Sequence, residues 1–410
     1  MMSGDHDLSI DQLRDIVQDA HLNFLVGAGA SSEYFSVLGD TENLLAEIDN
    51  STAGEAARTR ARASIYASFF QSVLVRNRQL IGADAGAARV LESYTLFLQT
   101  INRVLLRRRS SIINKQVNVF TTNVDLTIEV SAEKLQLELN DGFSGRFNPR
   151  FSTTNFGAVL SRRSLQYDNL SEIPTFNLLK LHGSVGWITA DHDPDGDEAR
   201  TDILFEPSLA IIDELDSMLA EIDDLLLPVA GETTAQSLLE AEPAADGADR
   251  IEAFLRRYED LPIVNPTKAK FQQTVLNQNY YDLLRIFSND LEKENSVLFL
   301  IGFSCRDEHI RELLVRAART NPTLQIFIFA YKPASISEIE GRFAGYQTTN
   351  GNIRVVGPAQ AAEGEDQESY DLRTITRRFF EPLVPRPPRR PDATVEVNVA
   401  LREPLVPGHD

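Results

Sequence analysis

Short apolar runs recur along the chain, separated by longer stretches in which apolar residues repeat at helical spacing. The runs are HLNFLV (21–26), QVNVFT (116–121), FNLLKLHG (176–183), SVLFLIG (296–302) and LQIFIFA (324–330). Strands that are apolar on both faces are typical of parallel sheets covered by helices on each side. The pattern therefore predicts an α/β fold built on a Rossmann-like, doubly wound parallel sheet.

Helical patterns fill much of the remaining chain. A helix is expected to begin after Asp307, a residue type that caps helix N-termini. Its apolar face comprises Ile310, Leu313, Leu314 and Ala317. Two regions read as helical insertions: an alanine- and arginine-rich region at about 50–112, and an acidic region at about 208–258. The second is expected to hold a surface helix followed by a loop.

The composition changes again near the C-terminus. Residues 361–410 are rich in proline, and TVEVNVAL (394–401) alternates as a β-strand does. Such a strand can pair with the sheet edge of another chain, or the segment can fold back on its own domain. We therefore expect one domain over residues 1–360 and a C-terminal arm at 361–410 that serves assembly or partner contact.

Charge and composition limit the function classes. The chain is 42% hydrophobic and 24% charged, with a net charge of −20, which opposes direct nucleic-acid binding. No apolar run is long enough for a membrane span, and the polar start MMSGDHDLSIDQL does not resemble a secretory signal, so a cytoplasmic location is expected. The single cysteine, Cys305, excludes a zinc ribbon built from CxxC pairs, and we expect no metal.

Polar and glycine residues follow the predicted strands where ligands bind in such sheets. The first run ends in GAGASS, where Gly27, Ala28, Gly29 and Ser31 can hold a phosphate or form only a tight turn. The third position of a dehydrogenase fingerprint is serine here, at Ser32. The acids about 20 residues further on lie in a helical pattern rather than at a strand end. A hydride-transfer enzyme is therefore disfavoured.

Two further strand ends carry candidate chemistry. TTNVD supplies Asn123 and Asp125, which can bind a carboxamide or a ribose, or alternatively shape a turn and cap the next helix. LHGS supplies His182, placed for proton transfer near neutral pH, with Gly183 beside it. Cys305, just after the apolar run at 296–302, is expected to be a packing residue rather than a nucleophile.

In this order, GAGAS (27–31), TTNVD (121–125), LHGS (181–184) and IGFSCRDEHI (301–310) resemble the sirtuin family over about residues 20–330. The resemblance implies that NAD lies over the sheet with its pyrophosphate at Gly27 to Ser31. Asn123 and Asp125 would hold the nicotinamide ribose and carboxamide, and His182 would be the catalytic base. The resemblance also implies that Gly302, Phe303 and Ser304 surround the adenosine end.

The departures from the family indicate a branch. Protein deacylases of this family usually carry a four-cysteine zinc module, and their second motif has glutamine where this chain has Thr122. TTN followed by Val-Asp, LHGS and a Pro-Thr-Lys element at 266–268 are similar to bacterial sirtuin-like NADases of anti-phage defence. That branch hydrolyses NAD to nicotinamide and ADP-ribose and so starves an infected cell.

The resemblance further implies a regulated effector. A freely active NADase would kill its own host, so a homo-oligomer controlled by a partner is expected, such as a HerA-type translocase or an Argonaute-like protein. Two other functions remain open at this stage. One is an NAD-dependent protein deacylase, and the other is a non-catalytic sensor of NAD or ADP-ribose.

Overall fold

The computed structural model describes residues 8–36, 41–108, 113–166, 168–191, 201–241, 247–264, 278–346, 350–362 and 364–384. Its centre is a seven-stranded sheet in the order β13-β12-β11-β1-β2-β8-β3, with every neighbouring pair parallel. The strands are β1 (His21–Val26), β2 (Gln116–Thr121), β3 (Glu138–Asn140), β8 (Thr175–Lys180), β11 (Ser296–Ile301), β12 (Gln325–Phe329) and β13 (Ile353–Val356). The prediction of an α/β fold with a parallel sheet is confirmed, and its five predicted strands are all present.

The order of the strands is that of a dinucleotide-binding sheet. If β1, β2, β8, β11, β12 and β13 are numbered one to six along the chain, they lie in the order 3-2-1-4-5-6, with β3 added beside β8. The order reverses between β1 and β11, which are paired along their whole length. Ligands of such sheets bind outside the carboxyl ends of the strands at this reversal point.

Helices cover both faces of the sheet, as the strands' two-sided apolar pattern requires. One face packs against α1 (Ile10–Asp19), α5 (Ala88–Arg107) and α6 (Thr127–Leu135), with Phe24 and Phe299 in the shared core. The other packs against α11 (Gln278–Glu292), α12 (Glu308–Thr320) and α13 (Pro333–Phe343), with Phe120 and Leu300 in its core. Helix α12 begins as predicted, because the Asp307 carboxylate accepts a hydrogen bond from the Ile310 N–H.

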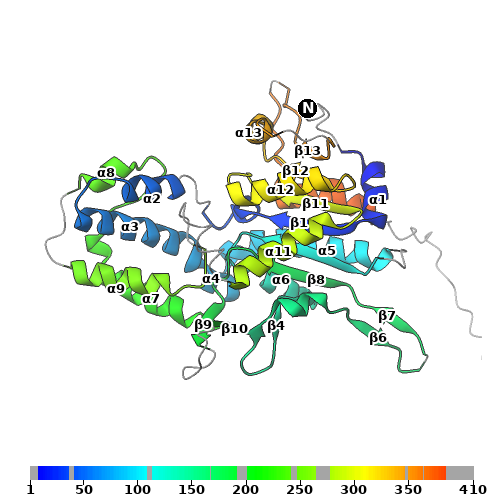
Figure 1. Cartoon of the computed structure of the whole chain (residues 1–410), viewed down its shortest axis with the longest axis horizontal. Helices are drawn as coiled ribbons and strands as arrows, with labels where there is room; N and C mark the ends of the chain where they lie inside the picture. Colours follow the sequence, from blue (N-terminus) through cyan, green and yellow to red (C-terminus); the bar gives the residue numbers. More distant parts are fainter. Residues whose placement is uncertain are drawn as a thin grey trace, which may run out of the picture.

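Parts of the two helical insertions come together in a separate lobe, at the left of Figure 1, whereas the end of the first insertion, α5, covers the main sheet instead. The lobe contains α2 (Thr41–Asp49), α3 (Glu55–Phe69), α4 (Arg76–Ile81), α7 (Ala210–Ala220), α8 (Ala235–Leu239) and α9 (Ala248–Glu259). The expectation of one helix and a loop for 208–258 is wrong at its end, where α9 forms. Ile251, Phe254, Leu255 and Tyr258 are buried on one face of α9, and the Tyr258 ring stacks on Tyr66 at 4.6 Å.

Two small antiparallel sheets lie beyond the main sheet. One has the order β4 (Phe143–Ser144), β5 (Arg150–Phe151), β10 (Thr201–Phe205) and β9 (Trp187–Asp191). The other is the hairpin of β6 (Ser161–Arg163) and β7 (Leu170–Glu172), which projects at the lower right of Figure 1. None of these short strands is predicted from the sequence, and β4 to β7 are too short, at two or three residues each, to show a period.

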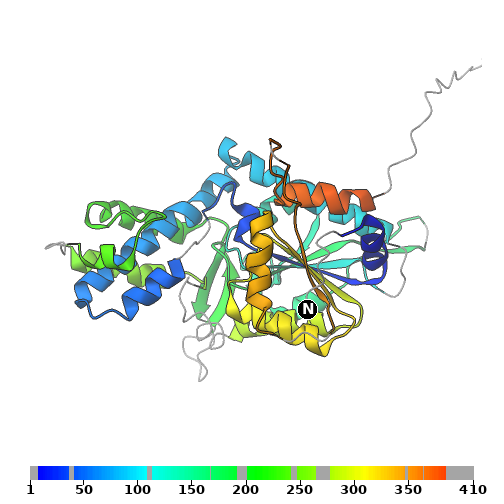
Figure 2. The same ribbon diagram turned by 90° about the horizontal axis from the view of Figure 1, so that it is seen from above.

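Part of the segment expected as a separate arm belongs to the domain core. Helix α14 (Leu372–Ile375) and the helical turn Thr376–Phe380 lie beside α5 (Figure 2), and the turn Glu381–Leu383 lies beside α1. The Phe380 ring lies 5.5 Å from that of Phe24 on β1. The predicted late strand at 394–401 lies outside the described residues. No helix in the described ranges is long and apolar enough to cross a membrane.

Candidate active site at the carboxyl edge of the sheet

The loops that follow β1 and β11 are packed directly against each other. The Gly27 N–H donates to the Ile301 carbonyl at 3.0 Å, and the Gly29 N–H donates to the Gly302 carbonyl at 2.9 Å. A Cβ atom at Gly27 or Gly29 would lie 2.7 or 2.8 Å from the Gly302 oxygen. The two glycines are therefore needed for contact between the loops, in addition to any approach by a phosphate. Ala28–Ser31 forms a short helical turn behind Gly27.

Asn123 is held at the end of β2 by the neighbouring loop. The Thr121 hydroxyl donates to the Val26 carbonyl at 2.8 Å and accepts from the Asn123 N–H at 3.0 Å. The Asn123 side-chain amide lies 3.3 Å from both the Gly27 carbonyl and the Ser31 hydroxyl. Its Oδ1 is buried and has no hydrogen-bond partner within the described residues. The geometric hydrogen bonds of the described residues leave this acceptor unused, and the Tyr94 hydroxyl interacts with the same side chain.

Ser31 positions Asn123 from within the protein. The Ser31 hydroxyl is buried and lies 2.7 Å from the Tyr94 hydroxyl of α5. Burial raises the pKa of Tyr94 above its ordinary value, and the Asp125 carboxylate adds to that rise. Tyr94 is therefore a neutral hydroxyl at physiological pH. The sequence reveals Tyr94 only as an apolar position on a helix, so its part in this site is missed there.

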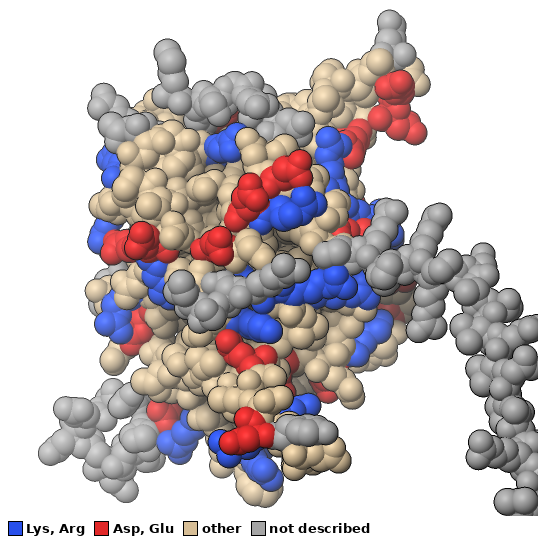
Figure 3. Space-filling view, turned by 90° about the vertical axis from the view of Figure 1, so that its right-hand side faces the viewer, with Lys and Arg blue, Asp and Glu red and all other residues tan. Residues whose placement is uncertain are grey.

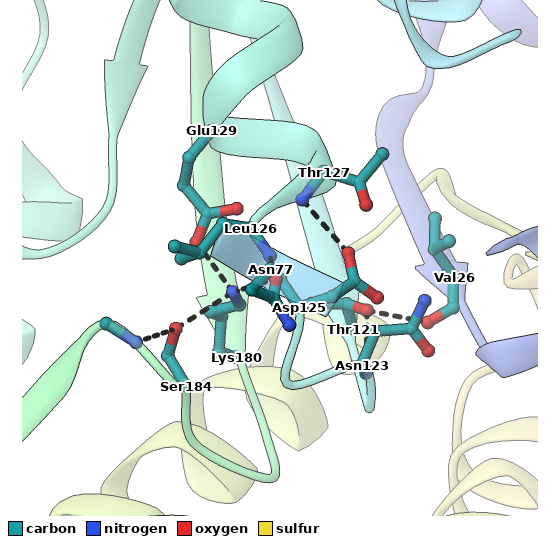
Figure 4. A network of polar contacts seen from close by, with 11 residues as sticks. Val26, Asn77, Thr121, Asn123, Asp125, Leu126, Thr127, Glu129, Lys180 and Ser184 are labelled. Atoms are coloured by element: carbon teal, nitrogen blue, oxygen red, sulfur yellow. Dashed lines mark hydrogen bonds and ion pairs between the residues drawn. The ribbon is translucent and has the colours of Figure 1, made fainter. Parts of the chain in front are cut away.

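Asp125 takes the structural role left open by the sequence. Its Oδ1 accepts a hydrogen bond from the Thr127 N–H at 3.0 Å, in the first turn of α6. The preceding N–H, that of Leu126, donates to the side-chain oxygen of Asn77 at 2.9 Å. Asp125 is buried beside Asn123 in this turn (Figure 4), so its carboxylate fixes the loop that carries Asn123.

A buried lysine ties the end of β8 to α6. The Lys180 ammonium lies 2.6 Å from the Glu129 carboxylate and donates to the Ser184 hydroxyl at 3.1 Å and to the Asp125 carbonyl. Burial raises the pKa of Glu129 above its ordinary value, while Lys180 opposes the rise. The three acceptors offset the cost of burying the ammonium group. Figure 4 shows this network bracing the loops on both sides of it. Within KLHGS, the sequence singles out His182 and Gly183 but not Lys180.

His182 follows β8 and faces a carboxylate from the far side of the reversal point. Its Nε2 lies 3.4 Å from Oδ2 of Asp307, and the two side chains are only 13% and 12% exposed. The other oxygen of Asp307 caps α12. From the sequence, Asp307 is expected only as a helix cap. The structure adds the contact that orients the imidazole.

The turn after His182 needs glycine. Gly183 has a φ of +78°, and a Cβ atom there would lie 2.0 Å from the Pro262 carbonyl oxygen. The His182 carbonyl accepts from the Val264 N–H at 2.9 Å, which fixes the turn against the chain that follows α9. Gly183 thus serves the backbone path that presents His182.

Asn123 and His182 occupy matching positions on neighbouring strands. Thr121 and Lys180 are register partners at the ends of β2 and β8, and the Leu181 N–H donates to the Thr121 carbonyl at 2.8 Å. Each site residue comes two positions after its strand partner. The structure therefore brings the two predicted catalytic residues to one edge of the sheet, with Asn123 in contact with the glycine loop and His182 in contact with Asp307.

The residues of the loop after β11 differ in their exposure and contacts. Gly302 meets the first loop, Phe303 is buried, and Ser304 is exposed while its carbonyl accepts from the Arg342 guanidinium. Cys305 is buried, and burial raises the pKa of its thiol to about 12. The thiol is therefore protonated at neutral pH, in agreement with its expected packing role.

A cavity of 310 Å³ lies at the opposite, amino end of the strands. Asn118 and Asn177 line it and belong to a hydrogen-bonded row of asparagines on adjacent strands, formed by Asn23, Asn118, Asn177 and Asn140. Because these amides satisfy each other, their burial is explained by the sheet itself.

No model of a known protein family and no curated protein matches the chain in sequence. In the ranges that the structure describes, no group of three His, Cys, Asp or Glu side chains is placed to hold a metal ion.

Proposed function

We propose that this chain is an NAD hydrolase, which cleaves the bond between nicotinamide and ribose to give nicotinamide and ADP-ribose. The observation that carries the proposal is the pairing of two groups at one sheet edge. These are the unpartnered acceptor of Asn123 and the imidazole of His182, held by Asp307. Asn123 contacts the glycine loop after β1, and His182 contacts Asp307 from beyond the reversal point of a Rossmann-like sheet.

The proposed reaction asks for little acid catalysis. Breaking the C1′–N bond of NAD releases neutral nicotinamide and leaves an oxocarbenium-like ribose. A water molecule then forms the new C1′–O bond and gives up one proton. Asn123 positions the ribose hydroxyls or that water through its Oδ1, and His182 accepts the proton. Hydrolysis therefore needs a donor-acceptor amide and one base, which are the groups present at this edge.

In the proposal, Asp307 sets the tautomer of His182. A carboxylate beside one ring nitrogen of histidine holds the tautomer in which that nitrogen carries the hydrogen. With Nε2 facing Asp307, Nδ1 of His182 is the nitrogen that accepts a proton. A sensor that only binds NAD has no need of an oriented base, so this pair favours hydrolysis over sensing.

The remaining site residues are assigned to the two ends of the dinucleotide. In the proposal, Gly27, Ala28, Gly29 and Ser31 face the pyrophosphate. Gly302, Phe303 and Ser304 line the adenosine end, and Asp125 and Gly183 shape the nicotinamide end. The packing of the first loop on Gly302 supports a common surface for both ends. The enzyme would act as the NAD-depleting effector of a bacterial anti-phage system, controlled by assembly with a partner such as a HerA-type ATPase.

The test separates hydrolysis from deacylation. The full chain is incubated with NAD in the presence and absence of an acetylated-lysine peptide, and nicotinamide is quantified. Hydrolysis predicts the same release in both samples. Release only in the presence of the peptide would show a deacylase instead and refute the proposal.

A further inference from the structure

Exposed apolar side chains are concentrated in one short stretch of the chain. Of the nine large hydrophobic residues that are exposed in the described ranges, five lie between residues 147 and 170. They are Phe147, Val159, Leu160, Leu165 and Leu170. Leu165 is fully open to water, and Leu170 is 68% exposed. Single exposed apolar residues are normal, but a cluster marks an interaction surface.

Most of this cluster lies on or beside the β6–β7 hairpin, whose strands lack further neighbours. Ser161 pairs with Glu172 and Arg163 with Leu170, and no third strand joins them within the described part of the chain. Figure 1 shows the hairpin reaching away from the main sheet. A two-stranded hairpin is marginally stable in water, and its outer edges expose backbone N–H and C=O groups. An additional strand would stabilise the hairpin and would pair with the backbone N–H and C=O groups along its edge.

The chain itself contains a segment of the required kind. TVEVNVAL (394–401), outside the described residues, alternates so that Val395, Val397, Val399 and Leu401 share one face of a strand. That face suits the exposed leucines of the hairpin. Its polar face carries Glu396, and Arg162 of β6 lies on the face of the hairpin opposite Leu170, where its charge is complementary. The two segments are therefore complementary in both apolar surface and charge.

A proline-rich linker joins this strand to the described structure. The described structure ends at Val384, and the sequence that follows opens with PRPPRRP at 385–391. Proline-rich linkers favour an extended conformation of about 3.1 Å per residue and act as spacers. We propose that residues 394–401 of one molecule add as a strand to the β6–β7 hairpin of a second copy of this chain. The proposal does not depend on the chemistry of the site.

Nucleic acid is the other class of partner that arginines on a hairpin attract. Residues 143–170 contain four arginines and one aspartate, a net charge of +3, within a chain of net charge −20. On the side of the molecule shown in Figure 3, basic side chains are interspersed with acidic ones. A mixed surface on an acidic chain opposes a phosphate backbone and favours a protein strand.

Site-directed cross-linking tests the contact in the full chain. The only native cysteine, Cys305, is buried, so the disulfides that form are expected to involve the introduced cysteines alone. Differently tagged Ser171→Cys and Asn398→Cys chains are mixed under mild oxidation. A disulfide between the two tags is expected, and it should fall at least about 10-fold when Leu165→Ser and Leu170→Ser are added. The control pair uses Ser217→Cys, on exposed α7, with Asn398→Cys and should not cross-link.

Light scattering on unmodified chains gives the second readout. The wild type is expected to be larger than a monomer, and Leu165→Ser/Leu170→Ser and Val397→Pro should each reduce its mass. Leu106→Ser, at a leucine of α5 that is 52% exposed, should not. Cross-linking no stronger than the control pair, or an assembly that nuclease dissolves, would each overturn the proposal.

Discussion

Nε2 of His182 lies 3.4 Å from Oδ2 of Asp307, and both side chains are almost buried. One residue follows β8 and the other precedes α12, so the contact spans the reversal point of the sheet. It gives the proposed base a fixed orientation.

Replacing Asp307 by asparagine should slow NAD hydrolysis without unfolding the protein. Asparagine still caps α12, but its amide can also pair with the wrong tautomer of His182. We expect the rate of nicotinamide release to fall at least about 10-fold, while NAD affinity and melting temperature change little. Asp371→Asn is the matched control, because Asp371 caps α14 through the Thr374 N–H in the same way. An equal loss of the rate of nicotinamide release in both variants would show that Asp307 acts by capping α12 and not through the imidazole of His182.

Tyr94 should act only through Asn123. Tyr94→Phe removes the hydroxyl bonded to Ser31, which in turn contacts the Asn123 amide. The loss of one such hydrogen bond should lower the hydrolysis rate by about 2- to 10-fold in the wild type. It should have no further effect in Asn123→Ala, since the group being positioned is gone. Additive losses in the double variant would place Tyr94 outside this chain of contacts.

Gly302 should be the glycine least tolerant of substitution in the two loops. Its φ is +63°, and a Cβ atom there would lie 2.1 Å from the Ala30 nitrogen. Gly302→Ala is therefore expected to lower the free energy of unfolding by about 1–3 kcal/mol. Gly231→Ala, where no atom lies within 4 Å of an added Cβ, should leave stability nearly unchanged. Thermal or denaturant unfolding of both variants decides the matter.

Cys305 should be inert towards alkylating reagents until the protein unfolds. Burial raises the pKa of its thiol to about 12, compared with about 8.5 in an unfolded chain. Because the folded state holds this proton more tightly, the associated stability is complete below about pH 8.5 and is lost as the pH rises towards 12. Iodoacetamide at pH 8 should therefore modify the denatured chain and spare the native one, as mass spectrometry can show. Rapid modification of the native protein would mean that this loop is open.

The sheet could be predicted because a buried parallel strand leaves a continuous apolar run. Gln116–Thr121 and Ser296–Ile301 are examples, and their glycine and asparagine neighbours mark the strand ends. The short strands β4 to β7 could not, because two or three residues show no period. Helix α9 carried a readable helical spacing from Ile251 to Tyr258, but the small residues before it suggested a loop.

The candidate site was predictable only where residues follow a strand directly. Asn123 and His182 meet that condition. Lys180, Tyr94 and Asp307 do not, because each acts through a contact made in three dimensions. Within the sequence, these three look like the end of a strand, an apolar helix position and a helix cap.

The most direct test of the central claim measures NAD binding and nicotinamide release together on the full chain. Calorimetry gives the affinity, and chromatography gives the product. The account predicts that the wild type binds NAD and releases nicotinamide, and that His182→Ala still binds but releases it about 100-fold to 10,000-fold more slowly. His21→Gln, at the opposite end of the strands, should behave as the wild type. NAD binding with equal release by the wild type and His182→Ala, or no binding at millimolar NAD, would contradict the account.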